Sequence, residues 1–379
     1  MIKALGLWSP AIVPLIISGI LLFSSERHNK PKLYLVAYMW LITFIFLANL
    51  FYFEHNYKVY SWFHSLHIAT VLAIYPGAYS YIKLLVDPNY PLRKLIRHFL
   101  PSLFFLLASG LIFYPVLNMQ ERELFLTQYR FHPDFENQAL RILYYVRISN
   151  ILFLFIQVLY YPVITFVTLK NHRKRLNNLF SNPEKFQLNW LGIFNGLLAL
   201  SALISVFIYT VNPVKLFGDD RYLAYPLLTV AIMLWYLGIM GNNQAQIPVP
   251  VDDDSLINPN SLGLQQDGNS LKSRLITYFE EQDPYLNPEL KIWDVARELG
   301  TNRTYISQTI NQEFDQNFSS FVNTYRIKQA RNLIDSNPEL SLSDVAFQTG
   351  FGSVLTLSRT FAEIYQVKLS DYKKELANV

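Results

Sequence analysis

Two different patterns of hydrophobic and polar residues divide the chain at about residue 240. Before this point, long apolar runs alternate with short polar breaks that carry turn signals, such as Asp87-Pro88-Asn89. A membrane span needs about 20 mostly apolar residues, because a helix rises about 1.5 Å per residue and the hydrocarbon core is about 30 Å thick. The runs predict seven spans, near Gly6–Phe23, Leu33–Phe53, Ser61–Ile82, His98–Leu117, Leu143–Leu169, Asn189–Val211 and Tyr222–Met240.

The charges of the connections between these runs predict an orientation. The first, third and fifth connections carry Arg27, Lys30, Lys32, Lys83, Arg93, Lys94, Arg97, Lys170, Arg173, Lys174, Arg175 and Lys185. The second, fourth and sixth carry fewer, namely Lys58, Arg122, Arg130, Arg141, Lys215 and Arg221. Because Lys and Arg favour the cytoplasmic side of short loops, we expect the N-terminus outside and the C-terminus in the cytoplasm. This pattern is typical of a multi-pass protein of the bacterial cytoplasmic (inner) membrane.

Cleavage of the first segment as a signal peptide is the alternative. It would leave six spans and place the C-terminal part outside the cell. The segment has only Lys3 as its charged n-region, a long apolar run and no A-x-A site after it. These features favour a retained first span.

Composition supports the division. The chain is 51% hydrophobic and 16% charged, against roughly 25% charged residues in an ordinary soluble protein. Its net charge of +4 is unevenly distributed: residues 1–240 contribute +10, residues 241–270 contribute −4 and residues 271–379 contribute −2. With no cysteine, the chain has no disulfide, thiolate metal site or cysteine nucleophile.

Residues 241–270 lack helical or strand periodicity and are rich in Asn, Asp, Gly, Ser and Pro. This composition favours loops and predicts that the segment is a flexible linker. A flexible chain of this length spans on the order of 30 Å. We therefore expect three parts: a transmembrane domain over residues 1–240, a linker over 241–270 and a helical domain over 271–379.

The third part contains a repeated pattern. DVARELGTNRTYISQTI, from Asp294, and DVAFQTGFGSVLTLSRTF, from Asp344, share Asp-Val-Ala and a Gly six residues after the Asp. Small Ala296 and Ala346 fit a close crossing of two helices. Gly300 and Gly350 permit a positive φ at the turn between them, and Asn302 and Ser341 are placed to cap helices. Two helix-turn-helix units are predicted, over 292–314 and 342–365, with a linking helix over Phe318–Leu333 between them.

This arrangement resembles the DNA-binding domain of the AraC family, over Ser273 to Lys374. The resemblance implies an all-α domain that presents two recognition helices to adjacent major-groove sites of double-stranded DNA, about one turn apart. By position, these helices are about Arg303–Phe314 and Ser353–Tyr365. Their expected outward, DNA-binding residues are Arg303, Thr304, Ser307, Gln308, Asn311, Ser353, Leu355, Thr356 and Arg359.

The chemistry of these side chains suggests roles. Arg359 suits a base or phosphate contact, Gln308 can pair with adenine, and Thr304 and Leu355 can touch thymine methyl groups. For Ser307, Asn311 and Ser353 the alternative is a solvated position without a DNA contact. Asn302 is better explained as a helix cap than as a base reader.

The sequence departs from the family pattern at a few positions. Gln366 and Leu369 stand where the family usually has Gly and Pro, and Asp315 replaces a common Gly. The domain charge of −2 also differs from the basic face of strong DNA binders, although Arg326, Lys328 and Arg331 would supply a local patch. We expect modest affinity of the monomer and a gain from homodimerisation.

Polar residues within the spans suggest a second site. His64 and His67 lie on one helix face, and Arg147 and Asn150 also fall within spans, where polar groups are costly and often functional. They are candidate residues for an unknown signal ligand or membrane partner, and interhelical hydrogen bonding is the alternative. No Walker loop, G-x-G-x-x-G, H-E-x-x-H or G-x-S-x-G motif is present, so no cofactor and no catalytic residue is expected.

The sequence therefore predicts an all-α protein, with a polytopic bundle in the lipid bilayer followed by a double helix-turn-helix domain. The favoured function is a membrane-bound, one-component regulator of transcription that responds to a signal. One alternative is an intramembrane hydrolase or acyltransferase that uses His64 and His67, with the C-terminal domain as its regulator. Two others are a passive membrane tether and a helical bundle for protein contacts.

Overall fold

The computed structural model describes residues 2–24, 29–129, 137–211, 224–244 and 268–377. The described residues are almost entirely helical and contain no named strand, which confirms the predicted all-α class. The chain divides into two compact units. One comprises Met1–Leu169 with Leu188–Gln244, and the other comprises Lys170–Gln187 with Ala245–Val379.

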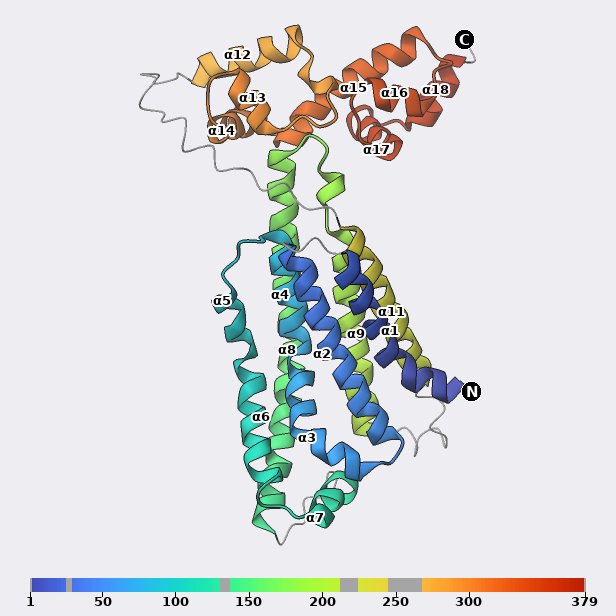
Figure 1. Ribbon diagram of the computed structural model, residues 1–379. Helices are drawn as coiled ribbons and strands as arrows, with labels where there is room; N and C mark the ends of the chain where they lie inside the picture. Colours follow the sequence, from blue (N-terminus) through green and yellow to red (C-terminus); the bar gives the residue numbers. More distant parts are fainter. Residues whose placement is uncertain (1, 25–28, 130–136, 212–223, 245–267, 378–379) are drawn as a thin grey trace. The chain divides into compact units, whose positions relative to one another are not determined.

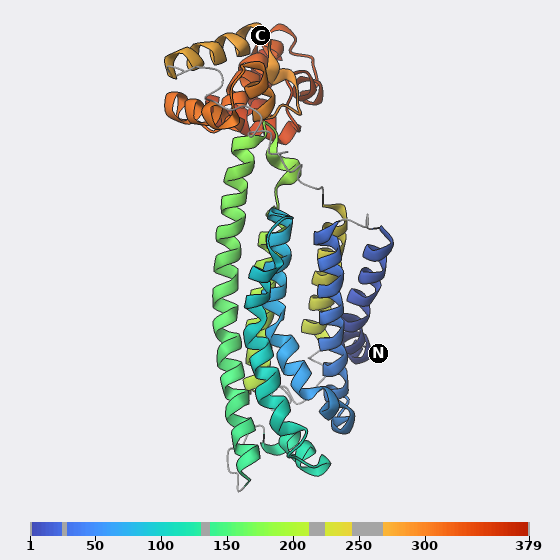
Figure 2. The same cartoon turned by 60° about the vertical axis from the view of Figure 1, so that its left-hand side comes forward.

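The first unit is a bundle of apolar helices (Figures 1 and 2). Its helices are α1 (Ile2–Ser24), α2 (Lys30–Phe53), α3 (Tyr57–Leu72), α4 (Ile74–Val86), α5 (Leu92–Ile96), η1 (Arg97–Phe99), α6 (Leu100–Phe113), α7 (Met119–Leu124), η2 (Phe125–Tyr129), α8 (Gln138–Leu179, as far as Leu169), α9 (Asn189–Val211) and α11 (Ala224–Asn243). Its main core gathers residues of α1, α2, α4, α8, α9 and α11. Many large apolar side chains remain exposed, among them Phe104, Ile156 and Phe166, as expected of a surface that faces lipid rather than water.

The helix α11 packs closely against a side chain of α1 at Gly238. A Cβ added at Gly238 would lie 2.5 Å from Ile17 Cγ2, so a larger residue would push the two helices apart. Small residues at helix interfaces commonly allow such packing in membrane proteins.

Five helices within the described residues are long and apolar enough to cross a membrane. A sixth crossing arises if α3 and α4 are taken as one broken span. The helix α9 covers the predicted sixth span, and residues 212–223, which include the start of the predicted seventh, lie outside the described residues. The count of seven therefore stays a prediction.

Two spans differ from their sequence prediction. The segment Ser61–Ile82 is two helices bent by 45° at Ala73, whereas the hydrophobic pattern alone suggests one continuous helix. The run Leu143–Leu169 is the central part of α8, a 42-residue helix that continues past the apolar run through Lys170 and Arg173 to Leu179. Its length is about 63 Å, at about 1.5 Å per residue, or about twice the hydrocarbon thickness.

The second unit is a helical domain whose long central helix is α15 (Figure 1). Its helices are the last ten residues of α8, η3 (Pro183–Phe186), α12 (Gly268–Glu281), η7 (Pro284–Leu286), α13 (Ile292–Glu298), α14 (Arg303–Phe314), α15 (Phe318–Ser336), α16 (Leu342–Gln348), α17 (Val354–Tyr365) and α18 (Leu369–Ala377). Most of the predicted linker, residues 245–267, lies outside the described residues.

Candidate nucleic-acid interface

The first helix-turn-helix unit is built by α13 and α14. Asp294 caps the start of α13, where its carboxylate accepts the Lys291 backbone N–H at 3.0 Å. Gly300 at φ +58° ends the helix, and the Thr301 N–H returns to the Ala296 carbonyl at 2.9 Å. Asn302 then caps α14 by accepting the Tyr305 N–H at 3.0 Å, as predicted.

The second unit repeats this geometry with α16 and α17. Ser341 caps α16 through the Asp344 N–H at 3.1 Å, and Gly350 forms the turn at φ +77°. The Phe351 N–H bonds to the Ala346 carbonyl at 2.9 Å, which is the counterpart of the bond between Thr301 and Ala296. The two repeated sequences thus produce the same helix–turn–helix backbone, and both glycines adopt the predicted positive φ.

The helix α15 joins the two units and contributes to the core of each. Phe318, Phe321 and Val322 pack with α12, α13 and α14, whereas Ile327 and Ile334 pack with α16, α17 and α18. A rigid helix with one end in each core fixes the spacing of α14 and α17. Its 19 residues span about 28 Å at about 1.5 Å per residue, slightly less than one turn of B-DNA.

Both recognition helices present exposed side chains on one face. On α14, Thr304, Gln308 and Asn311 are exposed at i, i+4 and i+7, while Arg303 and Ser307 are half-buried. On α17, Leu355 and Arg359 are exposed at i and i+4. These positions allow the predicted DNA contacts, whose individual roles stay predictions.

Two predicted contact residues of the second unit have partners within the protein. Ser353 is exposed, but its hydroxyl caps α17 by accepting the Thr356 N–H at 3.1 Å. The half-buried Thr356 donates its hydroxyl to Glu184 Oε1 at 3.1 Å. Glu184 belongs to η3, in the connection between the predicted fifth and sixth spans. A carboxylate therefore lies against the first turn of the second recognition helix.

The prediction that Arg326 belongs to a surface basic patch is wrong. Its side chain is fully buried, at the point of α15 where the two cores meet, while Lys328 and Arg331 are exposed. Burial lowers the pKa of the Arg326 guanidinium to about 9, and nearby Glu184 opposes this shift, so the group is still charged at neutral pH. In the sequence, the charge of the Arg326 side chain suggests a surface position. The sequence does not reveal the hydrogen-bond partners that allow its burial.

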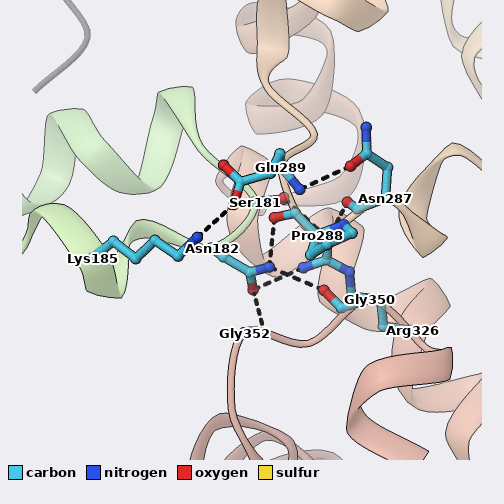
Figure 3. A network of polar contacts seen from close by, with 9 residues as sticks. All are labelled: Ser181, Asn182, Lys185, Asn287, Pro288, Glu289, Arg326, Gly350 and Gly352. Carbon is cyan, nitrogen blue, oxygen red and sulfur yellow. Dashed lines mark hydrogen bonds and ion pairs between the residues drawn. The ribbon is translucent and has the colours of Figure 1, made fainter.

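The Arg326 guanidinium makes a hydrogen bond with each of its five N–H groups. Figure 3 draws three of the acceptor residues, Ser181, Asn182 and Asn287. Nε donates to the Tyr285 carbonyl at 2.7 Å, and Nη2 donates to the Asn287 carbonyl at 2.9 Å. Nη1 donates to Asn182 Oδ1 at 3.0 Å and to Asn323 at 3.4 Å. The fifth bond runs from Nη2 to the Ser181 hydroxyl at 3.0 Å.

Asn182 is equally well satisfied and connects the chain before α13 with α15 and with the turn of the second helix-turn-helix unit (Figure 3). Its Nδ2 donates to the carbonyls of Pro288, at 2.7 Å, and Gly350, at 3.0 Å. Its Oδ1 accepts from Arg326 and from the Gly352 N–H at 3.3 Å. Sequence alone does not reveal the role of Asn182, because Asn182-Pro183 is only a turn signal between two apolar runs.

The polar residues of the spans lie in packed surroundings. His64 is buried beside the rings of Phe113 and Phe125, and the Tyr60 hydroxyl lies 2.9 Å from His67 Nδ1. Arg147 and Asn150, on α8, are also buried. Their predicted role in binding a signal stays a prediction, and the described residues hold no group of three His, Cys, Asp or Glu that would bind a metal ion.

Comparisons with known proteins agree with this geometry. A family model described as a helix-turn-helix domain matches residues 295–375, from α13 to α18. A curated relative, histidine kinase P4 from Formosa agariphila, is 22% identical over 156 residues. This match covers 41% of the present chain but only 11% of that protein, so it says nothing of kinase activity here. No solved structure matches the chain significantly.

The matched residues include both units and the helix between them. They contain the two positive-φ glycine turns, the two capped recognition helices and α15, which spaces them. The family match and the repeated geometry indicate regulation of transcription through DNA binding. The chain carries, at its C-terminal end, the double helix-turn-helix domain of the AraC family of transcription regulators.

Proposed function

We propose that the protein is a one-component regulator in the bacterial cytoplasmic membrane that couples a membrane or extracytoplasmic signal to transcription. One observation carries this proposal: α8 is a single helix that begins in the apolar unit and ends in the DNA-binding unit. A continuous helix can transmit a change of position or rotation between two units, which a flexible linker does poorly.

For the DNA contacts, we propose that α14 and α17 enter adjacent stretches of the major groove. Thr304, Gln308 and Asn311 of α14 and Leu355 and Arg359 of α17 would reach base edges or phosphates, because they are exposed on one face of each helix. Arg303, Ser307, Ser353 and Thr356 would contribute from the margins of these faces.

Homodimerisation is part of the proposal. The DNA-binding domain has a net charge of −2 over residues 271–379, and Arg326 is not available to phosphates. Since phosphate neutralisation supplies much of the affinity for DNA, one copy is expected to bind modestly and two copies more tightly. Tight, salt-insensitive binding by a monomer would contradict this part.

Genome-wide mapping of the DNA bound by the full-length protein tests the proposal. We expect a small set of recurring sites that contain two adjacent half-sites, and we expect Arg359→Ala to abolish their occupancy. Reporter proteins fused after Val379 test the topology, because the proposal requires the C-terminus in the cytoplasm. An external C-terminus, or sites that persist in Arg359→Ala, would refute it.

A sensor and a passive tether differ in their response to deletion. If the spans only tether the domain, a soluble protein made of the DNA-binding unit regulates like the full chain under all conditions. If they sense, regulation by the full chain depends on a signal. In the sensor, substitution of buried Arg147 or Asn150 is expected to change that dependence while the protein remains bound to DNA.

A further inference from the structure

A short segment from between two apolar helices is built into the DNA-binding unit. Phe180 pairs with Lys291 in an antiparallel bridge, and the Ser181 N–H donates to the Leu290 carbonyl at 3.1 Å. The Ser319 hydroxyl of α15 donates to the Ser181 carbonyl at 3.0 Å. Residues 180–185, which we call the docking segment, are therefore held by backbone and side-chain bonds like an internal part of the domain.

The polar groups of the docking segment match their site. Asn182 uses all four of its hydrogen-bonding positions, on Pro288, on Arg326 of α15 and on two glycines of the second helix-turn-helix unit, although the residue is only 8% exposed. Ser181 and Asn182 also accept two of the five N–H groups of buried Arg326. When the docking segment leaves, these two N–H groups of Arg326 lose their acceptors. Unpaired buried donors are costly, so Arg326 stabilises the docked state relative to the undocked state.

The docking segment brings Glu184 to the DNA-binding surface. The Glu184 carboxylate accepts the Thr356 hydroxyl at 3.1 Å, in the first turn of α17. N-terminal residues of a recognition helix contact base edges in helix-turn-helix proteins, and phosphates flank them. A carboxylate at this position engages the Thr356 hydroxyl in a hydrogen bond, and its negative charge repels the phosphate backbone of DNA.

We propose that the docking segment is an intramolecular inhibitor of DNA binding, with Asn182 and Arg326 as its anchor and Glu184 as its blocking group. The proposal rests on the DNA-binding function proposed above. In the docked state the second recognition helix is obstructed, and release of the segment exposes it. The segment directly follows α8, so a movement of this membrane helix is what would release it.

The first test measures DNA affinity of the full-length protein in lipid nanodiscs, on a duplex taken from the mapped sites. Glu184→Gln keeps the shape of the side chain and removes its charge. We expect binding about fivefold tighter, the effect of one nearby charge–phosphate repulsion at low salt. The matched control is Glu289→Gln, which removes the same charge from the exposed pair with Lys185, a residue of the docking segment rather than of α17.

The control separates a specific contact from net charge. Glu289→Gln should change the affinity less than about twofold, since surface ion pairs contribute little. Equal gains for both variants, or none for Glu184→Gln, would overturn the blocking role.

The second test locks the segment in place. A Cβ built at Gly352 lies 3.5 Å from Asn182 Cβ, within the range of a disulfide, and the chain has no other cysteine. The double variant Asn182→Cys, Gly352→Cys should therefore form a disulfide on oxidation. We expect the oxidised protein to bind DNA about tenfold more weakly than the same protein after reduction, because the lock prevents release.

Comparison of one protein before and after reduction cancels any effect of the substitutions themselves. The single-cysteine variants should show no response to oxidant. Failure of the disulfide to form under prolonged oxidation, which traps even brief docking in a variant that lacks the Asn182 anchor, would show that the segment does not dock. Unchanged or tighter binding on oxidation would show that docking does not inhibit. If the disulfide forms but even the wild-type protein binds no specific DNA, the proposed function fails and docking stands.

Discussion

Replacement of Asn182 by Ala is the most direct perturbation of the hydrogen bonds that hold the docking segment. It deletes four hydrogen bonds, of 2.7, 3.0, 3.0 and 3.3 Å, and leaves Arg326 Nη1 with the longer bond to Asn323. At a net contribution of about 1 kcal/mol for each bond, the docked segment loses about 4 kcal/mol. A change of about 4 kcal/mol corresponds to about a 1,000-fold larger opening constant.

Hydrogen exchange of the full-length protein, followed by mass spectrometry, measures this change locally. The reporter is the backbone amide of Ser181, which is bonded to the Leu290 carbonyl and keeps this acceptor in the variant. Lys185→Ala is the control from the same segment, because it removes only an exposed ion pair with Glu289 and should cost less than about 1 kcal/mol. If Asn182→Ala leaves the exchange of residues 180–187 at the wild-type rate, the network does not hold the segment.

Three further predictions concern the helix-turn-helix units. Gly350→Ala should destabilise the domain by more than about 2 kcal/mol in thermal unfolding, because the added Cβ would lie 2.5 Å from the Tyr285 carbonyl oxygen. The Cβ of Gly300→Ala meets no atom within 4 Å, so this variant should cost only about 1 kcal/mol of backbone strain. Equal losses for the two variants would contradict the close approach. Asp315→Gly should stabilise the domain by roughly 0.5 kcal/mol in the same assay, since Asp315 ends α14 at φ +52°, and a lower melting temperature would be the opposite result. Arg359→Ala should weaken binding to a mapped DNA site by about 10- to 100-fold in an anisotropy titration, and an equal loss on unrelated DNA would indicate a phosphate contact instead.

The local parts of the DNA-binding unit were predictable because their signals are local. Asn302 and Ser341 cap helices at the predicted positions, and α14 has the predicted bounds Arg303–Phe314. Capping and turn formation depend on a few neighbouring residues, which the sequence displays directly. Because the pattern occurs twice, the turn at Gly300 and the turn at Gly350 each support the assignment of the other to a helix-turn-helix unit.

What was missed depends on contacts between distant residues. Arg326 looks like a surface base, and only the fold brings the Asn182 side chain to it across 144 positions of sequence. The break at Ala73 is not specified by the apolar pattern, but Pro76 signals it, because a proline removes the backbone bond to the carbonyl four residues earlier, that of Leu72, where α3 ends. Hydrophobic patterning identifies such a segment as membrane-spanning without specifying its path.

The placement of residues 170–187 means that the DNA-binding unit is discontinuous in sequence. A gene fragment that begins near Gly268 encodes all the helices of the family match but lacks Ser181 and Asn182, which accept two of the five N–H groups of Arg326. Exchange of C-terminal domains between such regulators, in evolution or in the laboratory, would therefore separate each domain from its own docking segment. Recombination that preserves function has to move two stretches of sequence together, so we expect the Asn182 and Arg326 positions to be inherited as a pair.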